Sequence, residues 1–527
     1  MAIRIGFHGG VSTTTGACFL VEHGAGRLLV DCGLFSGTRT VRSLNRRALP
    51  FAPARLDCVL LTHAHLDHAG LLPRLVAEGL RAPIMATEAT LELLRALLPE
   101  VAHALATETA RLGRRLRRRG GPEVAPIYGE AEVRACLERI EACDFGRWFE
   151  PAPGVRARFW NAAHIPGSAS IELEIDEGTS RPARLLFSGD LGPEAASSDP
   201  DPRAPRDVDY LVAESLYGDR RRGEKSAAER RRRFVRELAE ALEGGGLAFL
   251  PVLGLERSCE LFLLLLEAVR DGALPPVPVR FVCRHGTRVL HALASCRASA
   301  FGAENLAELL ARSSVLACCD PETEDAGALS GPAVLLAPLG TAEAGFSRRA
   351  LRELLWRPEV TVLFGGHLPY GSLGQVVLSG EKRLRIDGEE VAVRARIRAL
   401  ESVCGHADGE ELVRWIAARR PVRKAIFLVR GSECATTALR AALAAEGFDP
   451  LAILVPRLDE RFELASDRPP RPLPGPTRLD PRFAAVAADW HNAHARLLLD
   501  IADELRVLPD DRSRLELLGR LRRTLRS

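Results

Sequence analysis

The sequence predicts an α/β protein with more than one domain. The chain has 527 residues, too many for a single hydrophobic core. Within the first sixty residues, short apolar runs alternate with Gly-rich turns, which indicates successive strands with little helix between them. From residue 216 onward, strand-like runs alternate with helical segments, a pattern typical of a parallel sheet. We therefore expect two or three domains, at least two of them α/β.

Composition and charge narrow the class of protein. Hydrophobic residues make up 46% of the chain, no stretch resembles a membrane span, and no basic leader precedes an apolar segment, so we expect a cytoplasmic protein without a membrane partner. The twelve cysteines lack the density and pairing of a secreted disulfide framework. With 72 basic and 69 acidic side chains, the net charge of +3 means that any polyanion must be held by a local groove. Composition neither requires nor excludes nucleic acid.

The first part of the chain contains mostly strand candidates. Runs of alternating or continuous apolar residues predict strands at 3–7, 18–21, 28–30, 59–61, 155–160, 171–175 and 185–187. Between residues 87 and 119, apolar residues recur at helical spacing among Arg and Glu, which predicts helices.

The second part alternates between the two kinds of element. Strands are predicted at 247–251, 279–282, 334–337, 360–364, 384–386, 391–397 and 425–429, with a helix over 409–418. Residues 466–476 are rich in Pro and Arg and predict an extended linker. Two amphipathic helices are expected beyond it, at 481–505 and 511–525.

The most informative motif follows the apolar run at 59–61. His63, His65, Asp67 and His68 place four metal-ligand types within six residues. Three imidazoles and a carboxylate so close together repel and desolvate one another unless a cation lies among them. A buried strand before them would put these side chains at its carboxyl end, where open α/β sheets bind their ligands. A solvated His-rich turn is the less favoured alternative.

Two further strand ends carry candidate ligands. His164 lies in a Gly/Ser turn after the strand predicted at 155–160, and Asp190 lies between glycines after the strand at 185–187. Taken singly, each is more often a structural turn residue. Together with the first motif they favour a metal site.

These motifs resemble a known family. HAHLDHAG at 63–70, AAHIPGSAS at 162–170 and FSGDLG at 187–192, preceded by Leu29-Val-Asp31-Cys-Gly33, resemble the successive motifs of the metallo-β-lactamase superfamily. Segments 213–220, 251–261, 366–374 and 403–408 resemble motifs of its β-CASP nucleases. The resemblance runs from about residue 5 to about residue 465.

The resemblance implies a domain plan. Residues 1–212 and 395–465 would form a metallo-β-lactamase αββα sandwich, and 213–394 an inserted β-CASP α/β domain. A Pro/Arg-rich linker would follow at 466–480, and a helical extension at 481–527.

The resemblance also implies a site with two zinc ions, with manganese as an alternative. His63, His65 and His164 would hold one metal, Asp67 and His68 part of the second, and Asp190 would bridge them. Asp31 would orient ligands, and Arg257 would lie near the substrate. Glu214 and His406 would protonate the leaving oxygen, so that with Asp67 they are the predicted catalytic residues. The alternatives are that Glu214 pairs with an arginine and that His406 caps a helix.

One position departs from the family pattern at a critical point. Relatives carry the last ligand of the second metal, a histidine, after the strand at 425–429, where this chain has Arg430. An arginine remains charged and repels a metal. We expect its guanidinium to occupy the second-metal region, paired with Asp67 or Asp190, so that one metal or none is bound. The alternative is that the strand slips by one residue and Arg430 faces solvent.

Two functions follow from these observations. The first is metal-dependent hydrolysis of RNA phosphodiester bonds, weakened by the change at Arg430. The second is a catalytically inactive paralogue that binds RNA or acts as a scaffold beside an active partner. The second is also favoured by drift at family segments near residues 283–285, 337–341 and 404. The tail helices are a candidate surface for a homodimer or for that partner.

Overall fold

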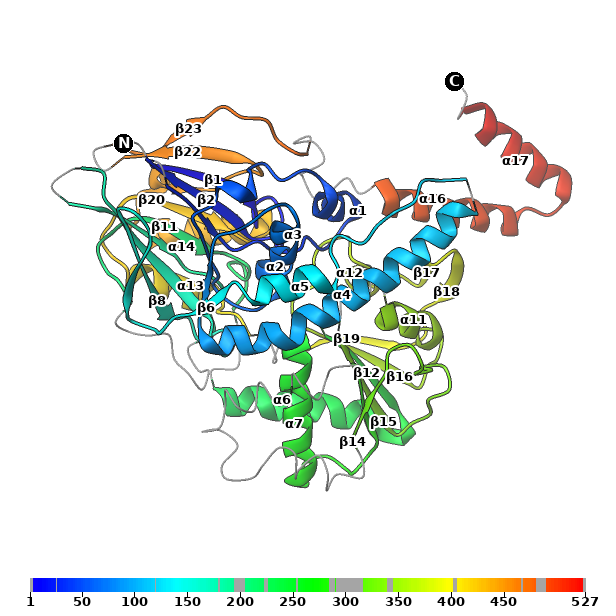
Figure 1. Cartoon of the computed structure of the whole chain (residues 1–527). Coiled ribbons are helices and arrows are strands. Elements are labelled where there is room, and N and C mark those ends of the chain that lie inside the picture. The colour runs from blue at the N-terminus through cyan, green and yellow to red at the C-terminus, as the bar shows by residue number, and fades with distance from the viewer. Residues whose placement is uncertain are drawn as a thin grey trace.

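The computed structural model describes residues 3–24, 26–118, 120–178, 181–193, 204–221, 226–252, 255–283, 290, 316–338, 345–400, 405–465, 468–479 and 490–524. Figure 1 shows two sheets packed together in one part of the molecule, a second α/β unit beside them and a helical tail that leads away from the body. No helix within the described ranges is long and apolar enough to cross a membrane.

Two large sheets form the first domain. The eight-stranded sheet has the order β23-β22-β1-β2-β3-β4-β5-β6 and the seven-stranded sheet the order β21-β20-β11-β10-β9-β8-β7. The strands of the first sheet are β1 (Ile3–Gly9), β2 (Cys18–His23), β3 (Gly26–Val30), β4 (Cys58–Leu60), β5 (Ile84–Ala86), β6 (Ile140–Ala142), β22 (Glu460–Leu464) and β23 (Arg471–Leu473). Those of the second are β7 (Trp148–Ala152), β8 (Val155–Asn161), β9 (Ala169–Ile175), β10 (Ala183–Phe187), β11 (Val208–Glu214), β20 (Val422–Val429) and β21 (Ile453–Leu454).

The core between these sheets explains why they pack face to face. Alternate side chains of both sheets meet in one buried apolar cluster, which contains Phe7, Phe427 and Phe462. The ring centroids of Phe7 and Phe427 lie 5.1 Å apart, and those of Phe427 and Phe462 lie 5.2 Å apart. Burial of such rings removes a large apolar area from water and fixes the relative position of the sheets.

Helices cover both outer faces, as in an αββα sandwich. The first sheet is covered by α2 (Leu66–Ala69), α3 (Leu72–Ala77), α4 (Glu88–Arg117) and α5 (Glu130–Leu137), whose buried side chains share a cluster with strand residues such as Leu29 and Val59. The second is covered by α13 (Gly409–Ala417) and α14 (Glu433–Ala445). The short helix α1 (Arg39–Arg42) follows β3. The fold predicted from the motifs is thus confirmed.

The inserted domain has its own parallel sheet, in the order β14-β13-β15-β12-β16-β19. Its strands are β12 (Leu247–Val252), β13 (Val279–Val282), β14 (Leu316–Cys319), β15 (Ala333–Pro338), β16 (Val360–Gly365) and β19 (Arg396–Leu400). Its helices are α6 (Ala227–Leu242), α7 (Leu255–Arg270), α11 (Gly345–Leu354) and α12 (Leu373–Leu378). The domain also contains a separate hairpin of β17 (Arg383–Ile386) and β18 (Glu389–Ala392).

The structure corrects three expectations. The single strand predicted over 391–397 is two strands, because β18 turns back on β17 through Asp387 and Gly388 while β19 joins the parallel sheet. The parallel sheet therefore extends beyond the domain limit expected at residue 394. Part of the segment expected to be a linker is β23, an edge strand on β22, where Pro472 is tolerated because the outer side of an edge needs no donor.

The tail consists of α16 (Trp490–Val507) and α17 (Asp511–Thr524). Its first helix is held against the inserted domain by Arg496 with Glu381 at 2.5 Å and by Arg506 with Glu390 at 2.7 Å. The helix predicted from residue 481 can be compared with the structure only from residue 490, since 481–489 lie outside the described residues.

Candidate metal centre and substrate cleft

Strand ends of both sheets meet at one edge of the sandwich. Asp31 follows β3 and the His63–His68 segment follows β4 in the first sheet. In the second sheet, His164 follows β8, Asp190 follows β10, and Arg430 follows β20. The topology thus brings together residues separated by up to 399 positions in the chain, as the motif pattern predicts.

Four of the predicted ligands form a compact group. Ligand atoms of His63, His65, His164 and Asp190 all lie within 4.8 Å of one another. His65 Nδ1 is 3.0 Å from both His63 Nε2 and His164 Nε2. Asp190 Oδ2 lies 3.6 Å from His63 Nε2 and 3.8 Å from His164 Nε2.

The protonation of this group suits a divalent cation. Burial lowers the pKa of His164 to about 3, and the neighbouring His65 acts in the same direction. Burial, followed by His68, lowers the pKa of His63 well below its usual value. These imidazoles are therefore neutral and offer nitrogen lone pairs, while Asp190 supplies the negative charge. Together with His65, these side chains form a set of three imidazoles and a carboxylate that fits a divalent metal.

A buried hydrogen-bond network holds the His63–His68 segment. Asp31 accepts hydrogen bonds from the Thr62 amide and hydroxyl, both at 2.8 Å, and its Oδ2 lies 2.7 Å from His68 Nδ1. Asp31 has a φ of +61°, a left-handed conformation that aspartate tolerates better than most residues. This arrangement fits the orienting role expected for Asp31, and it adds Thr62, a residue that was not predicted from the sequence.

Arg430 fills the region next to this group. Its Nε lies 2.7 Å from Asp190 Oδ1, and its Nη2 lies 2.9 Å from Asp190 Oδ2 and 2.8 Å from Asp67 Oδ2. The residue is only 3% exposed, so the alternative of a solvent-facing arginine is wrong. Its amide donates to the Gly10 carbonyl at 2.6 Å, and its φ is +63°. The expected pairing with the two carboxylates is present.

The side chains around Arg430 do not fit a second metal ion. Burial alone would lower the pKa of His68, but the charges of Asp190 and Asp31 outweigh this effect and raise it to about 9. His68 is thus a cation at neutral pH, between Asp31 at 2.7 Å and Asp190 Oδ1 at 3.2 Å. Asp67 and His68 were expected to hold the second metal, and each instead has an ionic partner within the protein.

Glu214 and His406 lie next to Asp190. His406 Nδ1 is 3.4 Å from Glu214 Oε2, and Glu214 accepts a hydrogen bond from the Leu191 amide at 2.5 Å. Burial, reinforced by Asp190, raises the pKa of Glu214 well above its usual value, which favours the protonated carboxyl. Neither alternative fits: Glu214 is next to His406, and the cap of α13 is Asp408.

The group lies in a cleft of about 1740 Å³ between the sandwich, the inserted domain and α16. His65, Asp67, His164, His406 and Arg430 all line it. Twelve arginines line this cleft against six acidic residues, although the whole chain has a net charge of only +3. The positive charge is thus concentrated locally, as expected for a groove that binds a polyanion.

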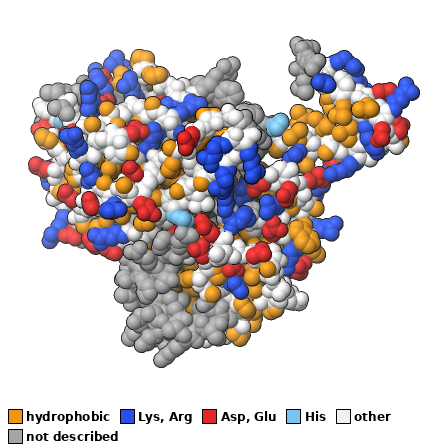
Figure 2. Space-filling model, turned by 45° about the vertical axis from the view of Figure 1, so that its right-hand side comes forward, with side chains coloured by type: hydrophobic (Ala, Val, Ile, Leu, Met, Phe, Trp, Pro, Cys, Tyr) orange, Lys and Arg blue, Asp and Glu red, His pale blue; other side chains and the backbone are white. Residues whose placement is uncertain are grey.

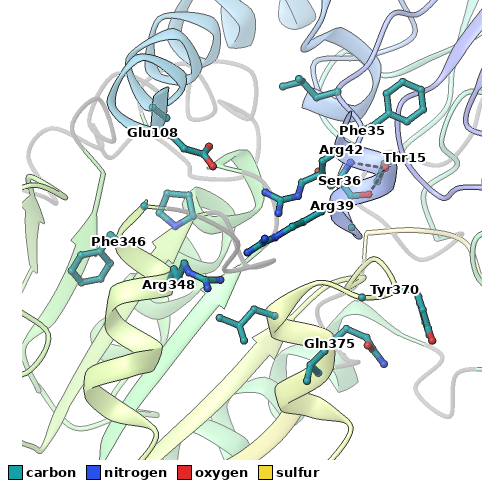
Figure 3. Close-up of a pocket in the computed structure, with 18 of the residues that line it drawn as sticks. Thr15, Phe35, Ser36, Arg39, Arg42, Glu108, Phe346, Arg348, Tyr370 and Gln375 are labelled. Atoms are coloured by element: carbon teal, nitrogen blue, oxygen red, sulfur yellow. Dashed lines mark hydrogen bonds between the residues drawn. The ribbon is translucent and has the colours of Figure 1, made fainter. Parts of the chain in front are cut away.

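Arginines from opposite walls face one another across the cleft. Figure 3 shows Arg39 and Arg42 of α1 pointing toward Arg348 of α11. Lys and Arg side chains also gather near the centre of the face shown in Figure 2. Arg257 also lines the cleft and pairs with Glu260. Its guanidinium lies so close to Gly405 that a Cβ added to this glycine would collide with Arg257 Nη2.

Some of these contributions were not predicted from the sequence. The Gly405 carbonyl accepts from His164 Nδ1 at 2.7 Å, which leaves Nε2 to face the ligand group. A backbone carbonyl has no signature in a sequence. Arg39 and Arg348 were missed because isolated arginines in amphipathic segments look like ordinary surface residues. The departures expected at residues 284–285, 339–341 and 404 lie outside the described residues.

Fold and ligand group together define the class of an αββα metallo-hydrolase with an inserted α/β domain. Family profiles agree: residues 12–239 match "Metallo-beta-lactamase superfamily", 259–377 match "Beta-Casp domain" and 390–453 match "Zn-dependent metallo-hydrolase RNA specificity domain". The chain belongs to the β-CASP nuclease family of the metallo-β-lactamase superfamily.

Several known proteins are similar over most of the chain. Ribonuclease TTHA0252 of Thermus thermophilus is 32% identical over 84% of this chain and 97% of its own length. The transcription termination factor FttA of Methanocaldococcus jannaschii is 27% identical over 82% of this chain and 67% of its own length. An RNase J-like protein of the same organism is 24% identical over 81% and 92%, respectively.

Proposed function

We propose that this protein hydrolyses phosphodiester bonds of RNA with a bound divalent metal ion, zinc or manganese. The observation that carries the proposal is the position of three imidazoles and Asp190 at a cleft lined by twelve arginines. The names of the similar ribonuclease, RNase J-like protein and termination factor support RNA as the polyanion.

His63, His65, His164 and Asp190 would hold the metal. When bound, such an ion supplies Lewis-acid charge for a phosphoryl oxygen and lowers the pKa of a water molecule. The cleft arginines neutralise the RNA backbone and set its path, because phosphate contacts position a strand without reading its sequence.

Glu214 and His406 are the proposed route for a proton to the departing oxygen. The Glu214 carboxyl is fully buried and its pKa is raised, whereas His406 Nδ1 lies 3.4 Å away and the His406 side chain lines the cleft. Proton transfer through His406 would avoid the release of an alkoxide, a poor leaving group at neutral pH.

A second function is favoured by Arg430. If the second metal is indispensable, the chain is an inactive β-CASP paralogue that binds RNA beside an active partner or as a homodimer. The tail offers a surface for such a contact, since Leu515 is 69% exposed and Leu518 is 42% exposed on α17. Figure 2 shows hydrophobic side chains gathered on the tail.

The deciding experiment is incubation of end-labelled single-stranded RNA with the full chain, in zinc or manganese and in a chelator. The hydrolase proposal predicts metal-dependent cleavage that is lost in His164→Ala and in Asp67→Ala. RNA binding without cleavage by the metal-loaded wild type would reject the hydrolase and support the paralogue.

A further inference from the structure

One donor of Arg430 has no partner among the described residues. Nη2 hydrogen-bonds Asp190 and pairs with Asp67, and Nε lies 2.7 Å from Asp190 Oδ1 as an ion pair without hydrogen-bond geometry. Nη1 is buried and makes no hydrogen bond with the described residues. A buried charged donor without a partner costs free energy, and native proteins rarely keep one without a reason. The side chain that carries this donor lines the cleft beside Asp67 and His406.

Asp190 joins this donor to the metal centre. Its Oδ2 lies within 3.8 Å of His63 Nε2 and of His164 Nε2, and the same atom accepts from Arg430 Nη2. The guanidinium therefore lies directly beside the ligand group. It is held rigidly, because two carboxylates fix its plane and the Gly10 carbonyl fixes its backbone.

We propose that Arg430 is the built-in second cation of this centre: it excludes a second metal ion and presents Nη1 to a phosphoryl oxygen of the substrate. The identification of that phosphoryl group with RNA rests on the proposed function. A guanidinium suits this task because it stays charged and its planar donors match phosphate oxygens.

Exclusion of a second metal follows from charge and from ligand occupancy. A divalent ion beside a fixed guanidinium is repelled, and the carboxylates that would attract it are already paired at 2.7 to 2.9 Å. The centre thus combines one exchangeable cation with one permanent cation.

The first test is metal stoichiometry, which needs no substrate. The full-length chain, titrated with zinc and measured by elemental analysis after gel filtration, should saturate at one ion, and Arg430→His should take up a second. A wild type that binds two ions would overturn the proposal. A histidine variant that still binds one would show that Arg430 is not what excludes the second ion.

The second test measures phosphate binding to the zinc-loaded full chain, with inorganic phosphate as the probe in calorimetry. Arg430→Gln should weaken binding at least about tenfold, since a charge-assisted hydrogen bond is lost. Arg430→Lys keeps a point charge, so its phosphate affinity should lie between those of the wild type and Arg430→Gln. The lysine variant also provides a test if the glutamine variant does not fold.

A matched control is Arg231→Gln, because Arg231 pairs with Asp271 at 2.8 Å and does not line the cleft. Its phosphate affinity should be unchanged. Equal phosphate affinity of wild type and both Arg430 variants would reject the contact. Neither test measures RNA cleavage, so the proposed role of Arg430 and the proposed hydrolysis of RNA can fail separately.

Discussion

Arg430 contacts Asp190 through two nitrogens, with Nε 2.7 Å from Oδ1 and Nη2 2.9 Å from Oδ2, although 240 positions separate the two residues. Both residues are buried, with exposures of 3% and 1%. Burial by itself would raise the pKa of Asp190, but the charge of Arg430 and then of His68 holds it well below its usual value. One carboxylate therefore serves both the metal ligand group and the guanidinium.

The neutral variant Asp190→Asn tests this double role. It should lower the free energy of unfolding by about 3 to 5 kcal/mol, because it leaves a buried guanidinium short of a partner. It should also abolish tight metal binding. Urea unfolding and a zinc titration measure the two effects. The control is Asp209→Asn, a fully buried carboxylate paired with Arg181 outside the cleft, which should lose stability and keep metal binding.

The Asp31 network should set metal affinity indirectly. Asp31→Asn weakens the contact to His68 and the hold on Thr62, so metal affinity should fall about 10- to 100-fold, as for other residues that orient ligands. Asp459→Asn is the control, since Asp459 Oδ1 lies 3.0 Å from Nδ1 of the buried His8 and neither residue lines the cleft. Similar losses of zinc affinity in both variants would show a general effect of instability.

The buried imidazoles make the metal-free protein sensitive to acid. His164 has a folded pKa of about 3, against 6.5 for an ordinary histidine, and that of His63 is also lowered. The unfolded chain then binds more protons, so the free energy of unfolding should fall as pH drops from about 6.5 toward 3. His164→Asn should flatten this dependence, which thermal unfolding across that range in a chelator measures. An unchanged pH slope in the variant would contradict the assignment.

The arginines of the cleft should hold RNA through its phosphates. Arg39→Ala and Arg348→Ala should each weaken binding of single-stranded RNA and reduce the salt slope by about 0.7 per lost phosphate contact. Fluorescence anisotropy at several salt concentrations measures both quantities. Arg231→Ala is the control, because Arg231 pairs with Asp271 at 2.8 Å and does not line the cleft. If its loss weakens RNA binding equally, the cleft is not the binding surface.

Gly33 permits the close approach of two segments at the site. A Cβ there would lie 1.7 Å from the Asp67 carbonyl oxygen, so Gly33→Ala must displace the His63–His68 segment. We expect reduced thermal stability together with reduced zinc affinity. Gly113→Ala provides the control, because nothing lies within 4 Å of its added Cβ, and alanine should stabilise α4 by up to about 1 kcal/mol.

The sequence allowed the ligand group to be predicted because its residues follow strands, and strand direction determines which ends meet. His164 and Asp190 were identified in this way together with the His63–His68 motif. The pairing of Arg430 was predicted from the family resemblance, which places a metal ligand at this position, and from the charge of arginine. The free Nη1 donor, the Gly405 carbonyl and the facing pair Arg39 and Arg348 could not be predicted, because they depend on backbone geometry and domain placement. The split of 391–397 into β18 and β19 was missed because the turn at Asp387 and Gly388 was not recognised.

The most direct measurement is anomalous diffraction from crystals of the full chain grown with zinc. The account predicts one strong peak per chain, among His63, His65, His164 and Asp190, with the Arg430 guanidinium beside it. Two peaks about 3.5 to 4 Å apart, the spacing of a two-metal centre, or no peak at this position, would contradict it.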